Sequence, residues 1–270
     1  MVLAAVVFAR AYVRPEAVAA ALAALGLFVL ASGCLYLLND VADRERDRLH
    51  PEKRFRPVAA GLAPTSLAVA VGVAGVAVAL ALGFALHWPF GVVLAGYVAL
   101  QLAYSWGLKH LVIIDLLAIA GGFVLRAVAG AVVIGVAISP WLYLCTFLLA
   151  LFLGVNKRWS ELHALDDAGA HRPVLRDYAP EFLEAMTAVT TTSALMAYAL
   201  YTFSAENLPR NHAMMLTIPV VLYGLLRYVY LVHVRRRGEA PERLLYQDPG
   251  VLASVVVWAI EVVLILQFAA

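Results

Sequence analysis

The residues best suited to chemistry lie in one short stretch, 39–61, which reads NDVADRERDRLHPEKRFRPVAAG. If its first half is helical, Asp40, Asp43 and Asp47 fall at i, i+3 and i+7 on one face, with Asn39 close to that face. Like charges at this spacing repel one another, and a bound cation relieves the repulsion. Oxygen ligands of this kind suit Mg²⁺, which usually combines a few carboxylates with substrate phosphates. We therefore predict that these four side chains bind Mg²⁺.

A plainer interpretation of the same stretch is a solvated loop whose acids pair with neighbouring arginines. We favour the metal because the acids keep helical register while the bases fill the gaps between them. The second half places Lys53, Arg54 and Arg56 between prolines, which stiffen the backbone, and Lys and Arg are the usual phosphate ligands. These bases are also a membrane-topology signal, but topology does not explain why they lie beside the acids.

A second polar stretch, NKRWSELHALDDAG, begins at Asn156 where another apolar run ends. It brings Lys157, Arg158 and Glu161 to the end of that run. Lys157 and Glu161 are four residues apart, so a simple ion pair remains an alternative to a functional role. We assign no role to His163.

Other polar residues lie within apolar runs or at their ends. Tyr104 and Lys109 end one run, and Asp115 and Arg126 lie eleven residues apart on one face of the next. Charges inside a membrane are costly and usually face a cavity or a partner. Asp115 is near the end of its run and could reach the first polar stretch. Arg126 is deeper, and a structural pair with Glu261 is an equally good interpretation.

The composition indicates what must position these residues. Of 270 residues, 64% are hydrophobic and 14% are charged, against roughly 45–50% and about 25% in soluble domains. We therefore expect one all-α integral membrane domain, residues 1–270, with about nine transmembrane helices. The expected spans, of which the short first one could be absent, are roughly 2–13, 17–38, 65–86, 89–107, 111–135, 140–155, 182–203, 212–234 and 249–268.

The charges between these spans are distributed unevenly. Nearly all Lys and Arg lie in every second connection, including the loops 39–64 and 156–181. By the positive-inside rule these connections face the cytoplasm. We expect a multi-pass protein of the plasma membrane whose active site faces the cytoplasm, capped by these two loops.

The run Asn-Asp-x-x-Asp-x-x-x-Asp after the second expected helix resembles the first motif of the UbiA prenyltransferase superfamily. That resemblance implies an intramembrane all-α enzyme with a central cavity and a magnesium–diphosphate site. The whole 39–61 string, with YSWGLKH (104–110), IDLLAIAGGFVLRAVAG (114–130) and NKRWSEL (156–162), is similar to one branch, the decaprenyl-phosphate phosphoribosyltransferases. Ordinary members carry a second aspartate-rich motif where this chain has NKRWSEL.

The resemblance implies transfer of 5-phosphoribosyl from phosphoribosyl diphosphate to a polyprenyl phosphate, with release of pyrophosphate. Its implied catalytic residues are Asp40, Asp43, Asp47, Lys53 and Lys157. Its implied substrate-binding residues are Arg56, Tyr104, Lys109, Asp115, Arg126, Arg158 and Glu161. Prenyl transfer from a prenyl diphosphate is the alternative, and a transporter or flippase fits less well. We expect no nucleic-acid partner and leave homo-oligomerisation open.

Overall fold

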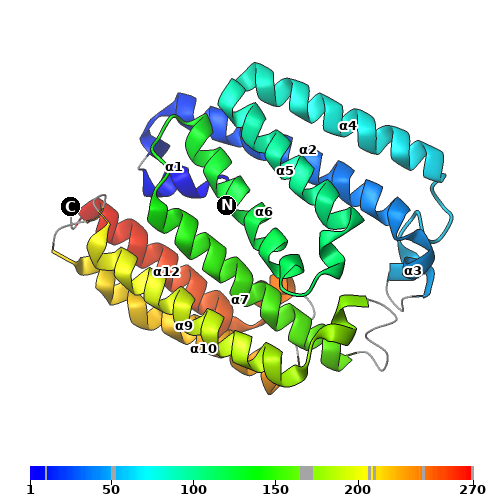
Figure 1. Ribbon diagram of the computed structural model, residues 1–270. Coiled ribbons are helices and arrows are strands. Elements are labelled where there is room, and N and C mark those ends of the chain that lie inside the picture. Colours follow the sequence, from blue (N-terminus) through cyan, green and yellow to red (C-terminus); the bar gives the residue numbers. More distant parts are fainter. Residues whose placement is uncertain are drawn as a thin grey trace. The chain divides into compact units, whose positions relative to one another are not determined.

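The computed structural model describes residues 1–9, 11–49, 53–164, 173–205, 208, 211–236, 238 and 241–268. Throughout these residues the regular structure is helical (Figure 1). The described chain divides into two compact units. Unit 1 comprises Met1–Ser139 with Pro173 and Val174, and unit 2 comprises the remaining described residues. Each unit is described by itself, and a single membrane domain stays a prediction.

Unit 1 is a layer of long helices with short helical pieces at their ends. Its elements in chain order are α1 (Ala4–Phe8), η1 (Ala11–Val13), α2 (Pro15–Ala42), α3 (Arg44–Leu49), η2 (Lys53–Phe55), α4 (Thr65–Leu86), α5 (Trp88–Trp106), η3 (Leu108–His110) and α6 (Ile114–Val133). Helices α2 and α5 both lie beside α4, and α5 also packs against α6 (Figure 1). Proline in the first turn starts both α2 and α5.

Small residues let the helices of unit 1 approach closely. A Cβ added at Gly72 of α4 would lie 2.7 Å from the Leu38 side chain of α2, so a larger residue would require that side chain to shift. The core between α2 and α5 is aromatic at its centre. Phe28 contacts Phe90 and Tyr97, with ring centroids 5.9 and 5.1 Å apart. This packing joins the middle of α2 to α5.

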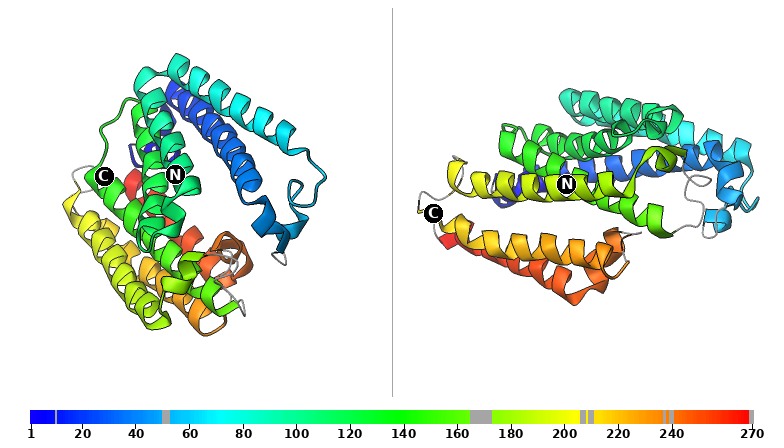
Figure 2. Two further views of the ribbon diagram at one scale, coloured as in Figure 1. Left: turned by 45° about the vertical axis from the view of Figure 1, so that its right-hand side comes forward. Right: turned by 60° about the horizontal axis from the view of Figure 1, so that its bottom comes forward.

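Unit 2 has four longer helices and three short helical elements. They are α7 (Pro140–Ala164), η4 (Pro173–Asp177, shared with unit 1), α9 (Pro180–Ser204), η5 (Ala213–Thr217), α10 (Ile218–His233), α11 (Pro241–Gln247) and α12 (Pro249–Phe268). Helix α7 packs on α9, and α10 packs on α12 (Figure 2). Asp248 joins the last two, because it accepts two hydrogen bonds from Arg227 and one from the Val251 amide that opens α12.

Seven helices of the described chain are long and apolar enough to cross a membrane. They are Pro15–Ala42, Thr65–Leu86, Trp88–Trp106, Ile114–Val133, Pro140–His163, Ala213–His233 and Pro249–Phe268. Large apolar side chains on α4 and α12 are exposed, as expected of helices that face lipid. Such residues include Leu67, Val71, Val78 and Leu82 on α4 and Val256, Ile260, Val263 and Leu264 on α12.

The expected count of nine spans is not confirmed. The first expected span, 2–13, is wrong as a continuous helix, because α1 has five residues and is followed by a separate 3₁₀ turn. Five residues rise about 7 Å, far short of the roughly 30 Å of a bilayer core. The seventh expected span, 182–203, is helical as α9, but its threonines make it less apolar than the seven helices above.

Candidate functional site

The polar end of α2 continues almost without a break into α3. Helix α2 ends at Ala42, and Asp43 adopts φ −95° and ψ 6° before α3 begins at Arg44. The Asp43 carbonyl still accepts a hydrogen bond from the Asp47 amide at 2.9 Å. The predicted helical continuation of α2 is therefore present, with a turn at Asp43. This turn helps direct the acids toward two different bases.

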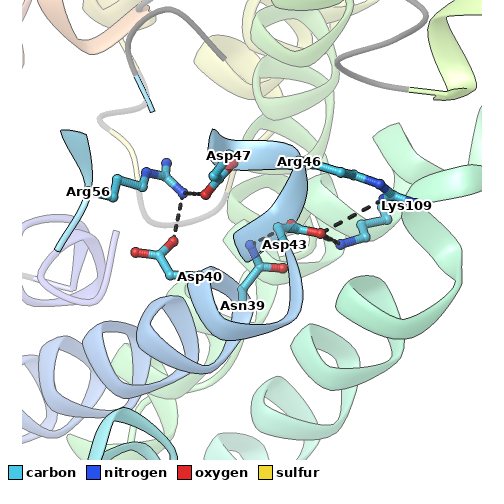
Figure 3. A network of polar contacts seen from close by, with 7 residues as sticks. All are labelled: Asn39, Asp40, Asp43, Arg46, Asp47, Arg56 and Lys109. Atoms are coloured by element: carbon cyan, nitrogen blue, oxygen red, sulfur yellow. Dashed lines mark hydrogen bonds and ion pairs between the residues drawn. The ribbon is translucent and has the colours of Figure 1, made fainter. Parts of the chain in front are cut away.

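Arg56 holds two of the acids. Its Nη1 donates to Asp40 Oδ1 at 2.6 Å and to Asp47 Oδ2 at 3.1 Å (Figure 3). Asp47 is only 4% exposed, so its charge needs a partner of this kind. Arg56 reaches the acids because η2, which it directly follows, packs against α3, and the Arg56 amide is bonded to the Lys53 carbonyl at 2.9 Å.

Lys109 holds the third acid. Its Nζ lies 2.8 and 3.0 Å from the two carboxylate oxygens of Asp43 (Figure 3). The Asn39 amide also donates to Asp43 at 3.0 Å, and Arg46 lies further away at 3.9 Å. Lys109 is buried and lies in η3, the short helical element that connects α5 to α6. We call Asn39, Asp40, Asp43, Asp47, Arg56 and Lys109 the acidic cluster.

The segment after Lys109 contains a strained turn. Ile113 has φ 69° and ψ −45°, and the Ile114 amide bonds to the Val112 carbonyl at 2.8 Å. This three-residue turn is rare and costly, above all for a β-branched residue. It leads directly into α6, where Asp115 lies in the first turn and is fully buried. An acid in the first turn of a helix is favoured by the helix dipole.

The acidic cluster has the donor types that Mg²⁺ prefers, since Asn39 and the three aspartates offer only oxygen ligands on this side. The aspartates do not converge, however, because Arg56 binds two of them and Lys109 binds the other. Within the described ranges no three His, Cys, Asp or Glu side chains are grouped as a metal site. The residues therefore fit the ion by chemistry, and a metal would have to compete with two built-in cations.

The interpretation as a solvated loop is only partly right. The exposed Glu45 does pair with the neighbouring Arg48, at 3.2 Å. Asp40 and Asp47 also pair with an arginine of the same stretch, Arg56, whereas Asp43 binds Lys109, which is 66 residues away in sequence. Of the other predicted residues in unit 1, Lys53 is exposed in η2, and Tyr104 is half-buried near the end of α5.

Arg126 lies in a separate polar group within the helices of unit 1. Its Nη2 donates to the Tyr97 hydroxyl at 2.6 Å, and its guanidinium carbon lies 4.9 Å from the centre of that ring. The same hydroxyl contacts Ser32 at 2.9 Å and Gln101 at 3.1 Å. Arg126 is about 18 Å along α6 from its start, so a role at the acidic cluster stays a prediction. A pair with Glu261 would join the two units and also stays a prediction.

A second group of functional candidates lies in unit 2, at the end of α7. Arg158 is 1% exposed and donates to Glu161 at 2.9 Å, so Arg158 rather than Lys157 pairs with this acid. Asn156 is fully buried, and its amide group donates to the Phe152 carbonyl at 2.8 Å. Its oxygen then accepts from Nε2 of His233 in α10, at 3.1 Å.

Aromatic stacking extends this group to residues that the sequence interpretation missed. Trp159 stacks on His163 and lies at a tilt of 33° against His233, with ring centroids 4.0 and 4.1 Å away. The guanidinium of Arg236 lies 5.0 Å from the Trp159 ring centre. We call this group the basic cluster; its members are Asn156, Lys157, Arg158, Trp159, Glu161, His163, His233 and Arg236. The four-residue spacing of Trp159 and His163 is the signal that could have indicated this stacking.

Part of the predicted caps lies outside the described residues. These parts are residues 50–52 of the first loop and residues 165–172 of the second. The predicted site residues themselves are all described.

Long apolar helices with acids and bases gathered at their ends define an intramembrane enzyme that handles charged groups. The chain belongs to the UbiA prenyltransferase family, whose model matches residues 1–247. It is a multi-pass membrane protein and a transferase.

Curated relatives and solved structures agree with this assignment. Decaprenyl-phosphate phosphoribosyltransferase of Corynebacterium glutamicum is 34% identical over 247 residues, covering 88% of this chain and 73% of the relative. The protein of that name from Mycobacterium tuberculosis is 34% identical over 233 residues, covering 86% and 76%. A UbiA homolog from Archaeoglobus fulgidus bound to DMAPP and Mg²⁺ has a TM-score of 0.70 and 21% identity, covering 90% of this chain and 85% of that chain. The same homolog bound to GPP and Mg²⁺ gives 0.69 and 21%, covering 93% and 86%.

Proposed function

We propose that this transferase moves 5-phosphoribosyl from phosphoribosyl diphosphate to a polyprenyl phosphate and releases pyrophosphate in a Mg²⁺-dependent reaction. The observation that carries the proposal is the basic cluster. It places Lys157 and Arg158 at the position where prenyl-transferring relatives are expected to carry a second acidic motif. The names of the relatives from Corynebacterium and Mycobacterium support phosphoribosyl transfer and a polyprenyl phosphate acceptor.

In this reaction one oxygen of the lipid phosphate forms a bond to the anomeric carbon as the bond from that carbon to diphosphate breaks. The lipid phosphate is already an anion at neutral pH, so no side chain has to remove a proton. The main difficulty is the negative charge that develops on the departing diphosphate. Magnesium held by Asn39, Asp40, Asp43 and Asp47 would supply positive charge to that leaving group.

Arg56 and Lys109 have two successive tasks in this proposal. Before substrate binds they neutralise the three aspartates, at distances of 2.6 to 3.1 Å. Once the aspartates have another cation, both bases can turn to phosphate oxygens, where Arg donates in a bidentate manner and Lys acts as a point charge. Lys53 is exposed beside Arg56 and would bind the same phosphates.

The basic cluster would bind further phosphate oxygens through Lys157 and Arg158, while Glu161 would contact ribose hydroxyls. Two anions repel one another, so holding them in register is itself a large part of catalysis. Tyr104 and Asp115 would line the acceptor side, and Arg126 would contact substrate deeper in the membrane. We place the reaction on the cytoplasmic side, because the Lys- and Arg-rich connections lie there by the positive-inside rule.

The test is an incubation of the purified full chain with labelled phosphoribosyl diphosphate and a polyprenyl phosphate. Magnesium-dependent label in the lipid phase is the expected result, and chelation by EDTA should abolish it. Transfer from a labelled prenyl diphosphate to an aromatic acceptor, with none from phosphoribosyl diphosphate, would overturn the proposal in favour of ordinary prenyl transfer. No transfer in either assay by folded protein would also overturn the proposed substrate pair.

A further inference from the structure

Trp159 is fixed firmly at the end of α7. Trp159 is 3% exposed, and its indole stacks on one imidazole from its own helix and packs at a tilt against one from α10. Both imidazoles are themselves held. His163 Nδ1 donates to the Trp159 carbonyl at 2.8 Å, and His233 donates to Asn156 at 3.1 Å. The ring of Trp159 therefore offers a rigid aromatic surface to whatever lies next to it.

The chain that follows α10 folds back onto this surface. The Tyr230 carbonyl accepts from the amides of both Val234 and Arg235, which ends the helix. Arg236 has φ 56°, a left-handed conformation that is uncommon for residues other than glycine. Gly238 is then buried against α7, where an added Cβ would lie 2.8 Å from the Ser160 Cβ. Only glycine allows this approach, so the turn is built to lie on the end of α7.

The turn sends two adjacent arginines to different places. Arg235 donates from Nε to the Tyr230 hydroxyl at 3.0 Å and lies over that ring. Arg236 instead lies over Trp159, with its guanidinium carbon 5.0 Å from the ring centre. Stacking on an aromatic face restrains a guanidinium but leaves its N–H donors, which point outward in its own plane, available. In the described part of the chain Arg236 has no carboxylate partner.

The surroundings of Arg236 carry a surplus of positive charge. Lys157 and the buried Arg158 come from the same helix end as Trp159. The nearby Glu161 is already bonded to Arg158 at 2.9 Å. Glu184 of α9 is a second acid close to this group, since its charge acts on His233. The three bases Lys157, Arg158 and Arg236 still outnumber the two acids, and a planar guanidinium suits phosphate in particular.

We propose that Arg236 is a phosphate-binding residue, held in position by the ring of Trp159, for one of the two phosphorylated substrates. This inference rests on the proposed function for the identity of those substrates. The shared chemistry is a phosphate monoester or diphosphate, present both in phosphoribosyl diphosphate and in the polyprenyl phosphate. The segment after α10 would thereby bind phosphate together with the end of α7.

The experiment compares R236Q with R235Q in the purified full chain. The two variants remove the same charge from neighbouring positions, but only R236Q removes the guanidinium that lies over the Trp159 ring. Calorimetry would measure the affinity of each for phosphoribosyl diphosphate with Mg²⁺ and, separately, for farnesyl phosphate as a short lipid phosphate. We expect R236Q to weaken one of the two ligands about tenfold, and R235Q to leave both within about twofold. The ligand that weakens identifies which substrate Arg236 binds.

A second pair of variants tests the part played by the indole. W159F keeps an aromatic ring and should retain most of the affinity. W159L removes the ring and should lower the affinity for the same ligand as R236Q does. R236K keeps the charge at position 236 and should therefore lose less affinity than R236Q. Thermal unfolding of each variant reports whether the fold is retained.

The outcomes separate this inference from the proposed function. Unchanged affinity for both ligands in R236Q, in an enzyme that transfers phosphoribosyl, overturns the inference alone. An intact chain that transfers no phosphoribosyl overturns the proposed function, yet a loss of phosphate-ligand affinity confined to R236Q would still support the role of Arg236.

Discussion

The acidic cluster of unit 1 and the basic cluster of unit 2 stabilise their charges in different ways. In the acidic cluster three aspartates are bound by Arg56 and Lys109 through short ion pairs. In the basic cluster one ion pair, Arg158–Glu161, is accompanied by one cation that lies over an aromatic ring, Arg236 over Trp159. A carboxylate bound by a base can exchange that base for a metal. An arginine on an aromatic ring keeps its donors available, so the second cluster is ready for an anion without any exchange.

The largest expected effect comes from removing a metal ligand from the acidic cluster. D43N keeps the shape of the side chain and removes its charge, so transfer should fall about 100-fold or more, as when other charge-stabilising groups are lost. E45Q is the matched control, because Glu45 is exposed in α3, two residues after Asp43, and pairs with Arg48. Initial rates across a Mg²⁺ titration measure both. Equal rates in D43N and wild type would remove the metal role from Asp43.

Replacing Arg56 should change the affinity for Mg²⁺ and the affinity for pyrophosphate in opposite directions. R56Q removes a cation that competes for Asp40 and Asp47, so Mg²⁺ alone should bind several-fold tighter. The same variant loses a phosphate donor, so pyrophosphate should bind about tenfold more weakly. Calorimetry with each ligand alone checks the two signs.

R54Q provides the control for this comparison, because Arg54 is exposed in the same turn and lies 4.8 Å from the Phe55 ring. It should change neither affinity. R56Q also leaves the buried Asp47 without its partner and should lower the stability of the fold. R56K keeps the charge and should retain that stability. A fall in both affinities in R56Q would contradict the exchange of cations.

A smaller effect is expected from Lys157 in the basic cluster. K157Q should raise the KM of one phosphorylated substrate about fivefold while the melting temperature stays the same, because Lys157 is only half-buried. K157R should recover most of the loss. Steady-state kinetics with each substrate varied in turn is the measurement. Unchanged KM values for both would exclude Lys157 from phosphate binding.

The smallest effect concerns the structural ion pair between Arg227 and Asp248. It tests whether every buried ion pair in the protein contributes to function. Hydrogen bonds from Arg227 lower the pKa of the Asp248 carboxyl to about 2. Because this pKa is below the ordinary value of about 3.9, the pair stabilises the fold fully above pH 4. The stabilisation is lost as the pH falls from about 4 toward 2.

D248N should therefore lower the melting temperature at pH 7 by about 2–4 °C and leave the transfer rate unchanged. Its stability should also depend less on pH between 4 and 2 than that of wild type. Thermal unfolding at several pH values checks this. A large loss of transfer in D248N would show that the pair belongs to the functional machinery after all.

The parts of the site predicted from sequence were those set by local spacing. Asp40, Asp43 and Asp47 were placed together by helical periodicity, and Arg56 follows them closely enough in sequence to be included. The ion pair between Lys109 and Asp43 joins residues 66 positions apart in sequence, so it depends on how α5 packs beside α2. Spacing along the chain carries no information on such a contact.

The residues that were missed had a second, simpler explanation in the sequence. The run Arg235–Arg237 follows an apolar segment and reads as a topology signal, which gave no reason to look further. His233 and Arg236 acquire their roles only from the turn at Arg236 and the close approach of Gly238. The long apolar helices were predicted well, because about 20 apolar residues are enough to define one. The first expected span failed because apolar composition does not show where a helix stops.

The threonines of α9 have a consequence for the assembly of the protein in the membrane. Thr187, Thr190 and Thr191 donate to backbone carbonyls one turn earlier, so their hydroxyls are satisfied within the helix itself. Helix α9 packs along α7, which is among the helices apolar enough to cross a membrane. If α9 lies in the bilayer beside α7, these hydroxyls would need no partner from lipid, so the threonines add little to the cost of placing the helix there.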